Sequence, residues 1–135
     1  HGSFDTHAGE LMNHEKLWSD LSVALGDFFD DLEAHGRDKD VTVLLFSEFG
    51  RRIEDNGSGT DHGSGGVAFV MGGSVNGGFF GEQPSLEIPE QVEGDMRFNN
   101  DFRSTYATLL DQWLNVDPYP ILGDHYEQHE LIGKV

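Results

Sequence analysis

Residues 41–52 read VTVLLFSEFGRR, and this segment carries the strongest indication of the fold. Its first six residues, 41–46, are apolar at both alternating sets of positions and rich in β-branched side chains. Such a run is typical of a strand covered on both faces, as in the parallel sheet of an α/β protein. Ligands of open α/β sheets bind beyond the carboxyl ends of the strands, and Glu48 lies there. The stretch therefore predicts a central strand that leads into a functional loop.

An amphipathic helix is expected before this strand. Apolar residues recur at three- and four-residue steps from Leu11 to Leu32, and the other positions are mostly acidic or polar. Gly36 follows the last of them and is a typical helix stop. His14 lies on or near the apolar stripe, where a structural histidine is the expected role.

The segments after the strand are less regular. Residues 53–66 are polar and glycine-rich without an apolar period, so we interpret them as a functional loop. Residues 67–71 predict a second buried strand. A last helix is expected from about Asp101 to Leu114, with Asp101 as an N-cap.

Composition limits the possible functions. The 135 residues include 25 Asp and Glu but only 8 Lys and Arg, which gives a formal net charge of -17. A phosphate backbone would be repelled, so nucleic acid is excluded as a partner. A solvated surface explains most of this acidity, which also suits cation binding. The absence of cysteine excludes disulfides and thiolate chemistry, and no apolar run is long enough to span a membrane.

The length predicts a single domain over residues 1–135. The two predicted core strands, residues 41–46 and 67–71, are fewer than a parallel α/β sheet normally has. The chain also begins at His1 with residues that are typical of a protein interior. We therefore expect the C-terminal portion of a larger domain, with the N-terminal part of the same protein as a missing partner.

Candidate metal ligands occur in three short segments. Asp5 and His7 precede the first helix, Glu48 follows the central strand, and Asp61 and His62 lie in the glycine-rich loop. Carboxylates and imidazoles gathered on loops are what a divalent metal needs. Two carboxylates with two imidazoles fit zinc or manganese, whereas more oxygen ligands favour calcium or magnesium. Asp61 can be a ligand or can fix the ring of a ligating histidine.

Each of these residues also has a structural interpretation, which the sequence leaves open. Asp5 can cap the first helix while His7 lies on the surface. Asp61 and His62 can belong to a surface turn. His125, four residues before His129, is interpreted as part of a solvated tail.

The two arginines after the strand add a further choice. Glu48 can form an ion pair with Arg51 or Arg52, because a lone buried carboxylate is costly. Alternatively, the guanidinium fork of Arg51 matches the oxygens of phosphate or sulfate, which predicts that it steadies a substrate anion. Arg52 is expected to be exposed.

Taken in order, these motifs resemble an exported bacterial family, the domain-of-unknown-function family 1501. The resemblance is carried by five segments: residues 4–7, 45–51, 59–63, 71–73 and 101–103. That family is placed in the alkaline phosphatase-like superfamily, with the sulfatases and the cofactor-independent phosphoglycerate mutases. The resemblance implies a three-layer α/β/α sandwich with a mostly parallel sheet. It also implies twin-arginine export to a periplasmic or secreted location.

The resemblance further implies a metal-dependent hydrolase or transferase that acts on a small anionic ester of phosphate or sulfate. Asp5, His7, Glu48 and His62 look similar to the metal ligands of the superfamily. Two departures leave alternatives open: Glu48-Phe49 stands where an Asp-His pair is common, and the nucleophilic Ser or Thr belongs to a part absent from this chain. One alternative is a non-catalytic binding or surface protein, and another is calcium that staples the glycine-rich loop.

Overall fold

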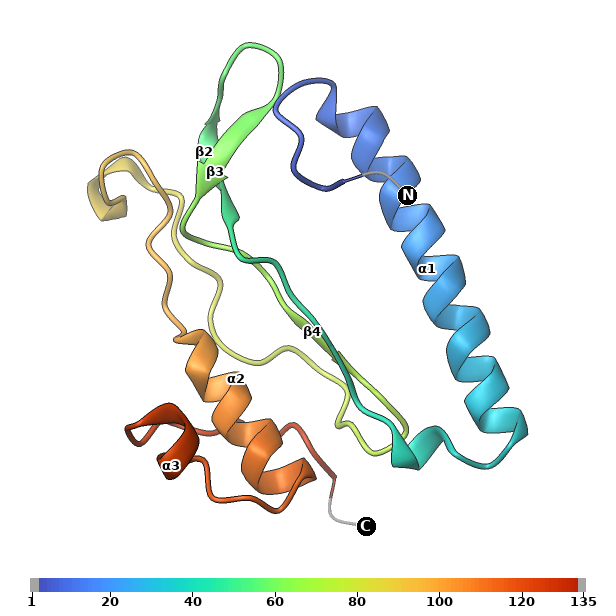
Figure 1. Ribbon diagram of the computed structural model, residues 1–135. Coiled ribbons are helices and arrows are strands. Elements are labelled where there is room, and N and C mark those ends of the chain that lie inside the picture. Colours follow the sequence, from blue (N-terminus) through green and yellow to red (C-terminus); the bar gives the residue numbers. More distant parts are fainter. Residues whose placement is uncertain (1–2, 134–135) are drawn as a thin grey trace. The chain divides into compact units, whose positions relative to one another are not determined.

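The computed structural model describes residues 3–133, which form two compact units, and each unit is described by itself. The first unit comprises residues up to 37 together with 46–67 and 84–98, and the second comprises 38–45, 68–83 and 99 onwards. Figure 1 shows the elements in chain order. The prediction of one domain that continues upstream stays a prediction.

The first unit contains the long helix α1, Glu10–Ala34 (Figure 1). It begins after Gly9, with φ of 61°, and ends before Gly36, with φ of 63°, so the predicted stop is confirmed. Part of the predicted apolar stripe is half-buried, namely Leu17, Leu21, Leu25 and Leu32. No residue of α1 is fully buried, and Leu11 is 87% exposed.

The first unit also contains a β-hairpin in place of the expected loop. Strand β2, Gly50–Asp55, pairs antiparallel with β3, Thr60–Gly63. The side chain of Asn56 closes the turn by accepting hydrogen bonds from the backbone N–H groups of Ser58 and Gly59. The interpretation of residues 53–66 as a loop is therefore wrong for residues 53–55 and 60–63, which are strand residues, whereas the functional role of the segment stays a prediction.

Two glycines let backbones approach closely at the base of this hairpin. A Cβ on Gly50 would lie 1.7 Å from the carbonyl oxygen of Gly65, and a Cβ on Gly63 would lie 2.6 Å from the carbonyl carbon of Arg51. No side chain fits at such distances. The glycine content of this region thus reflects close packing of the hairpin backbone.

The second unit contains the other sheet. Strand β1, Val43–Leu45, pairs antiparallel with β4, Phe69–Met71. Both sheets of the described chain have two strands, and both are antiparallel. The predicted α/β class, a three-layer sandwich with a mostly parallel sheet, is therefore wrong. A parallel pair needs a crossover, usually a helix, whereas residues 46–68 contain the β2–β3 hairpin instead.

Helix α2, Phe102–Thr108, carries most of the buried residues of the second unit. Its backbone continues as a π-helical segment, Leu109–Trp113, and the short helix α3 spans Tyr119–Leu122. The predicted N-cap is confirmed, because the carboxylate of Asp101 accepts a 2.9 Å hydrogen bond from the backbone N–H of Arg103.

The buried part of the second unit lies between α2 and the C-terminal tail. Thr108 is fully buried, and Ala107 and Leu131 are 1% and 5% exposed. The Thr108 hydroxyl donates to the Ser104 carbonyl at 2.7 Å and accepts from the His129 N–H at 3.0 Å. One buried threonine thus ties the tail to the helix.

The remaining regular elements are two short 3₁₀ turns, Asp38–Asp40 and Ile88–Glu90. No helix within residues 3–133 combines the length and the apolar character that a bilayer span requires. This agrees with the expectation from the sequence.

Candidate metal centre

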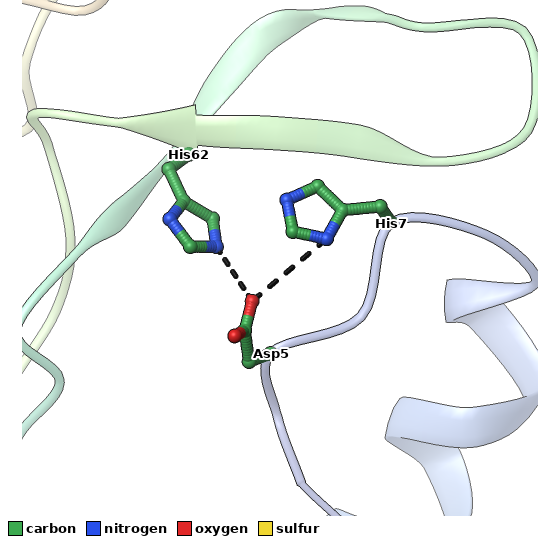
Figure 2. A group of neighbouring side chains, drawn as sticks. All are labelled: Asp5, His7 and His62. Carbon is green, nitrogen blue, oxygen red and sulfur yellow. Dashed lines mark hydrogen bonds and ion pairs between the residues drawn. The ribbon is translucent and has the colours of Figure 1, made fainter.

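Three side chains predicted as metal ligands meet in the first unit (Figure 2). The Nε2 atom of His62 donates a 2.7 Å hydrogen bond to Oδ1 of Asp5, and Nδ1 of His7 lies 3.8 Å from the same oxygen. One ligand atom from each residue lies within 4.8 Å of the other two. The three side chains are about half exposed, at 55%, 49% and 42% for Asp5, His7 and His62. The cluster is therefore open to solvent.

Two separate segments supply this cluster. Asp5 and His7 come from the extended residues before α1, and His62 comes from strand β3 (Figure 2). The imidazole of His62 stacks on the ring of Phe49 with centroids 3.7 Å apart and planes 7° apart. Its other neighbour is the ring of His7, at 4.7 Å. These contacts hold the His62 ring in one orientation.

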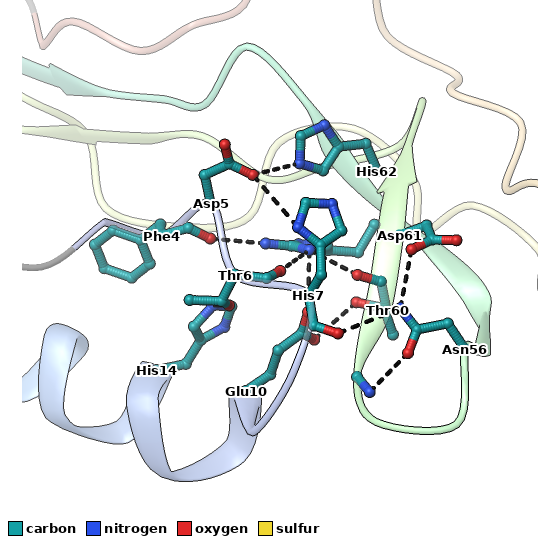
Figure 3. A network of polar contacts seen from close by, with 12 residues as sticks. Phe4, Asp5, Thr6, His7, Glu10, His14, Asn56, Thr60, Asp61 and His62 are labelled. Carbon is teal, nitrogen blue, oxygen red and sulfur yellow. Dashed lines mark hydrogen bonds and ion pairs between the residues drawn. The ribbon is translucent and has the colours of Figure 1, made fainter.

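Arg51 joins the two segments, and Figure 3 labels the residues to which it donates, Phe4, Thr6, Glu10 and Thr60. Its guanidinium donates to the carbonyl oxygens of Phe4, Thr6 and Thr60 at 2.7, 2.5 and 2.8 Å. It also forms a 3.0 Å ion pair with Glu10. The Arg51 and Glu10 side chains are only 22% and 15% exposed, so this ion pair is more buried than the three candidate ligands.

Glu10 is held in its ionised form by this arrangement. Desolvation raises its pKa, but the hydrogen bonds from Thr60 and the positive charges of Arg51 and His14 outweigh it, so that the pKa lies below the ordinary value of 4.5. The Thr60 hydroxyl donates to Glu10 Oε2 at 2.8 Å. Glu10 is therefore a charged partner of Arg51 over the neutral pH range.

His14 supports the N-terminal segment from the side of α1. Its Nε2 atom forms a 2.8 Å hydrogen bond with the Thr6 hydroxyl, and its ring packs against that of Phe4 at 5.6 Å. These contacts agree with the structural role expected for this residue.

Two other predicted ligands lie outside the cluster of three. Asp61 accepts a 2.9 Å hydrogen bond from Asn56, and it neighbours His62 on β3, where successive side chains point to opposite faces (Figure 3). Glu48 is exposed and is not a member of the cluster. Their roles as metal ligands stay predictions that this geometry does not support.

The predicted anion-binding role of Arg51 also lacks support, because both terminal nitrogens already donate to protein oxygens. Sequence reasoning missed Glu10, which resembles any acidic residue in the first turn of a helix. It also missed the three carbonyl groups that accept hydrogen bonds from Arg51, because every residue has a carbonyl group and the sequence does not distinguish these three.

The three ligand atoms suit a small divalent cation. Two ligands of one tetrahedral zinc ion are separated by about 3.3 Å, given metal–ligand distances near 2 Å. The corresponding distances from Asp5 Oδ1, 2.7 and 3.8 Å, lie on either side of that value. Small rotations of exposed side chains can therefore place all three donors around one ion.

The described residues thus form two antiparallel sheets and bring two imidazoles and one carboxylate together in a cluster. The profile of a family described as a protein of unknown function, DUF1501, matches residues 1–125. The chain belongs to this family, which confirms the family predicted from the motifs. No curated protein and no solved structure matches the chain.

The match does not extend to the wider superfamily. The alkaline phosphatase-like sandwich is contradicted by the two antiparallel sheets. Any function must therefore be argued from the side chains that the structure brings together.

Proposed function

We propose that this protein binds a divalent metal ion through Asp5, His7 and His62. The observation that carries the proposal is the convergence of these three side chains, which come from segments more than fifty residues apart. Two imidazoles and one carboxylate form a ligand set that is widely used for catalytic metals.

The donor set favours zinc or manganese. Two of the three donors are imidazole nitrogens, whereas calcium and magnesium prefer oxygen ligands. A calcium ion that stabilises the glycine-rich segment is less well supported, because the side chain of Asn56 already stabilises the turn of that segment by hydrogen bonds.

Three protein ligands leave coordination positions for water or substrate. A metal bound in this way lowers the pKa of its water and polarises an ester oxygen. We therefore propose, more specifically, that the protein hydrolyses a phosphate or sulfate ester or transfers that group. The exposure of the cluster supports this proposal, because a substrate can reach it. Recognition of the anion would fall to the metal, since Arg51 is engaged.

A non-catalytic metal-binding or surface protein is the second candidate. The engaged guanidinium of Arg51 and the formal charge of -17 both favour it, because neither helps to attract an anionic ester. The exported location that the family resemblance implies is compatible with both candidate functions.

Calorimetric titration of the metal-free protein with zinc and then with manganese tests metal binding. We expect one site, with affinity lowered at least tenfold by His62→Ala and by Asp5→Asn. His35→Ala is the matched control, because this exposed histidine follows the last residue of α1 and contacts Asp31 at that far end of the helix. Equal affinity of the His62→Ala variant and the unchanged protein would remove the proposed site.

Ester hydrolysis is then measured with a chromogenic phosphate and a chromogenic sulfate. Activity that requires the metal and is lost in His62→Ala supports the hydrolase. Metal binding without turnover of either ester supports the non-catalytic protein.

A further inference from the structure

We propose that Arg51 is a positioning residue of the metal centre, which holds the segment of Asp5 and His7 against the strand of His62. This inference rests on the proposed metal site and replaces the anion-binding role expected from the sequence. It concerns one guanidinium and the backbone oxygens around it.

The guanidinium of Arg51 donates hydrogen bonds to the N-terminal segment on both sides of Asp5. Nη2 donates to the carbonyl of Phe4 at 2.7 Å, and Nη1 donates to the carbonyl of Thr6 at 2.5 Å. These two carbonyls belong to the residues before and after Asp5. Holding both of them restricts where the Asp5 carboxylate can lie, and it fixes the point from which His7 extends.

The same guanidinium donates a hydrogen bond to the strand that carries His62. Nη1 donates to the carbonyl of Thr60 at 2.8 Å, and Thr60 and His62 share one face of β3. Arg51 is also the cross-strand partner of His62 in the hairpin register. The Phe49 ring, on which His62 stacks, lies 5.1 Å from the guanidinium carbon.

Glu10 fixes the orientation of the guanidinium. Its Oε1 atom accepts from Nη1 at 3.0 Å, while Oε2 accepts from the hydroxyl of Thr60 at 2.8 Å. A planar guanidinium can donate in several fixed directions at once, whereas a lysine ammonium is a compact charge on a flexible stem. Arg51→Lys therefore keeps the positive charge but cannot form all of these hydrogen bonds at the same time.

Zinc titration of Arg51→Lys tests the proposal, with Arg52→Lys as the matched control. Arg52 is the neighbouring residue of β2 and is exposed. We expect Arg51→Lys to bind zinc at least tenfold more weakly with an unchanged circular dichroism spectrum, and Arg52→Lys to bind within twofold of the unchanged protein. An affinity within twofold for Arg51→Lys would overturn the proposal.

A second variant decides the matter if Arg51→Lys does not fold. Glu10→Gln keeps the shape of the side chain and weakens its hold on the guanidinium. We expect a zinc affinity about threefold lower, less than the tenfold or more that is typical for direct partners of metal ligands, because Glu10 acts on the ligands only through Arg51 and Thr60. Unchanged affinity in Glu10→Gln would then overturn the proposal.

A metal-free measurement separates this proposal from the metal site itself. Nuclear Overhauser contacts between the His62 and Phe49 rings, and the proton on His62 Nε2, report the position of His62 without zinc. We expect both to be lost in Arg51→Lys and kept in Arg52→Lys, even if the protein binds no metal. Retention of both in Arg51→Lys would overturn the positioning role alone.

Discussion

Different kinds of contact stabilise the interior of each of the two units. In the first unit no residue of α1 is fully buried, and the half-buried guanidinium of Arg51 donates to four residues, namely Phe4 and Thr6 before α1, Glu10 in α1 and Thr60 in β3. In the second unit, Ala107, Thr108 and Leu131 are almost fully buried between α2 and the tail. Apolar packing is thus concentrated in the unit that lacks the candidate metal centre.

The two units should therefore be destabilised by different kinds of substitution. The first unit depends on directional hydrogen bonds and on close backbone approach, which position side chains but bury little apolar surface. The second unit depends on filled space around a small helix. The two tryptophans of the chain, Trp18 in α1 and Trp113 after α2, can report the two units separately in single-tryptophan variants.

The largest expected effect is that of Gly50→Ala in the first unit. The new Cβ would lie 1.7 Å from the Gly65 carbonyl oxygen, so one backbone must move. We expect a loss of about 3 kcal/mol of unfolding free energy, comparable to a severe case of overpacking. Denaturant unfolding followed by Trp18 fluorescence measures it.

Gly77→Ala is the control for that substitution, because its new Cβ meets no atom within 4 Å. The comparison between the units breaks down if Gly50→Ala and Gly77→Ala are equally stable.

A smaller effect is expected for Thr108→Val in the second unit. Valine keeps the shape but removes both hydrogen bonds of the hydroxyl, which leaves the His129 N–H without that acceptor. We expect a loss of about 2 kcal/mol, the usual cost of an unsatisfied buried group. Trp113 fluorescence should record an earlier transition. Thr108→Ser, which keeps the hydroxyl, should lose less, and an equally stable valine variant would show that packing alone holds the tail.

Acid should destabilise the first unit through Glu10. Because the folded pKa of this carboxyl lies below its ordinary value of 4.5, its ionisation stabilises the fold above that pH, and the contribution is lost as the pH falls through the folded pKa. The unfolding free energy of the unchanged protein minus that of Glu10→Gln should be about 1 kcal/mol at neutral pH and should shrink below pH 4.5. A difference that does not change with pH would show that the Arg51–Glu10 ion pair adds no stability.

The smallest expected effect has the opposite sign. Gly26 lies inside α1, and a Cβ there would meet no atom within 4 Å. Gly26→Ala should raise the unfolding free energy by about 0.5–1 kcal/mol, because alanine favours the helix more than glycine. Thermal unfolding checks it, and a destabilised variant would show that this face of α1 is more closely covered than the structure indicates.

Local signals in the sequence predicted local structure well. The apolar stripe with Gly36 predicted α1, and Asp101 predicted the start of α2, because a helix and its caps depend on residues a few positions apart. The direction of strand pairing was not predictable in this way. An apolar strand of three residues, such as Val43–Leu45, carries no information about whether its partner runs parallel or antiparallel.

The hairpin was missed for a different reason. Residues 53–66 show no alternation of apolar and polar side chains, since the hairpin forms around Arg51 and the glycines and not around an apolar face. The pair Asn56-Gly57 was the signal that could have revealed its turn.

The candidate site was predicted in part. Asp5, His7 and His62 were identified because metal-binding residue types stood in short motifs, and the structure brings these three together. The sequence could not show that Asp61 would bond Asn56, or that Arg51 would bond backbone carbonyls. Those outcomes depend on how distant segments pack.

Whether Asp5, His7 and His62 share a divalent ion can be read from the resonances of the histidine rings. Long-range ¹H–¹⁵N spectra of the imidazole rings are recorded while zinc is added to the ¹⁵N-labelled protein. Of the seven histidines in the chain, we predict coordination shifts for two, at Nδ1 of His7 and Nε2 of His62, where the present contacts to Asp5 lie. If these two rings do not respond to zinc, or respond no more than His35, the three residues do not share a divalent ion.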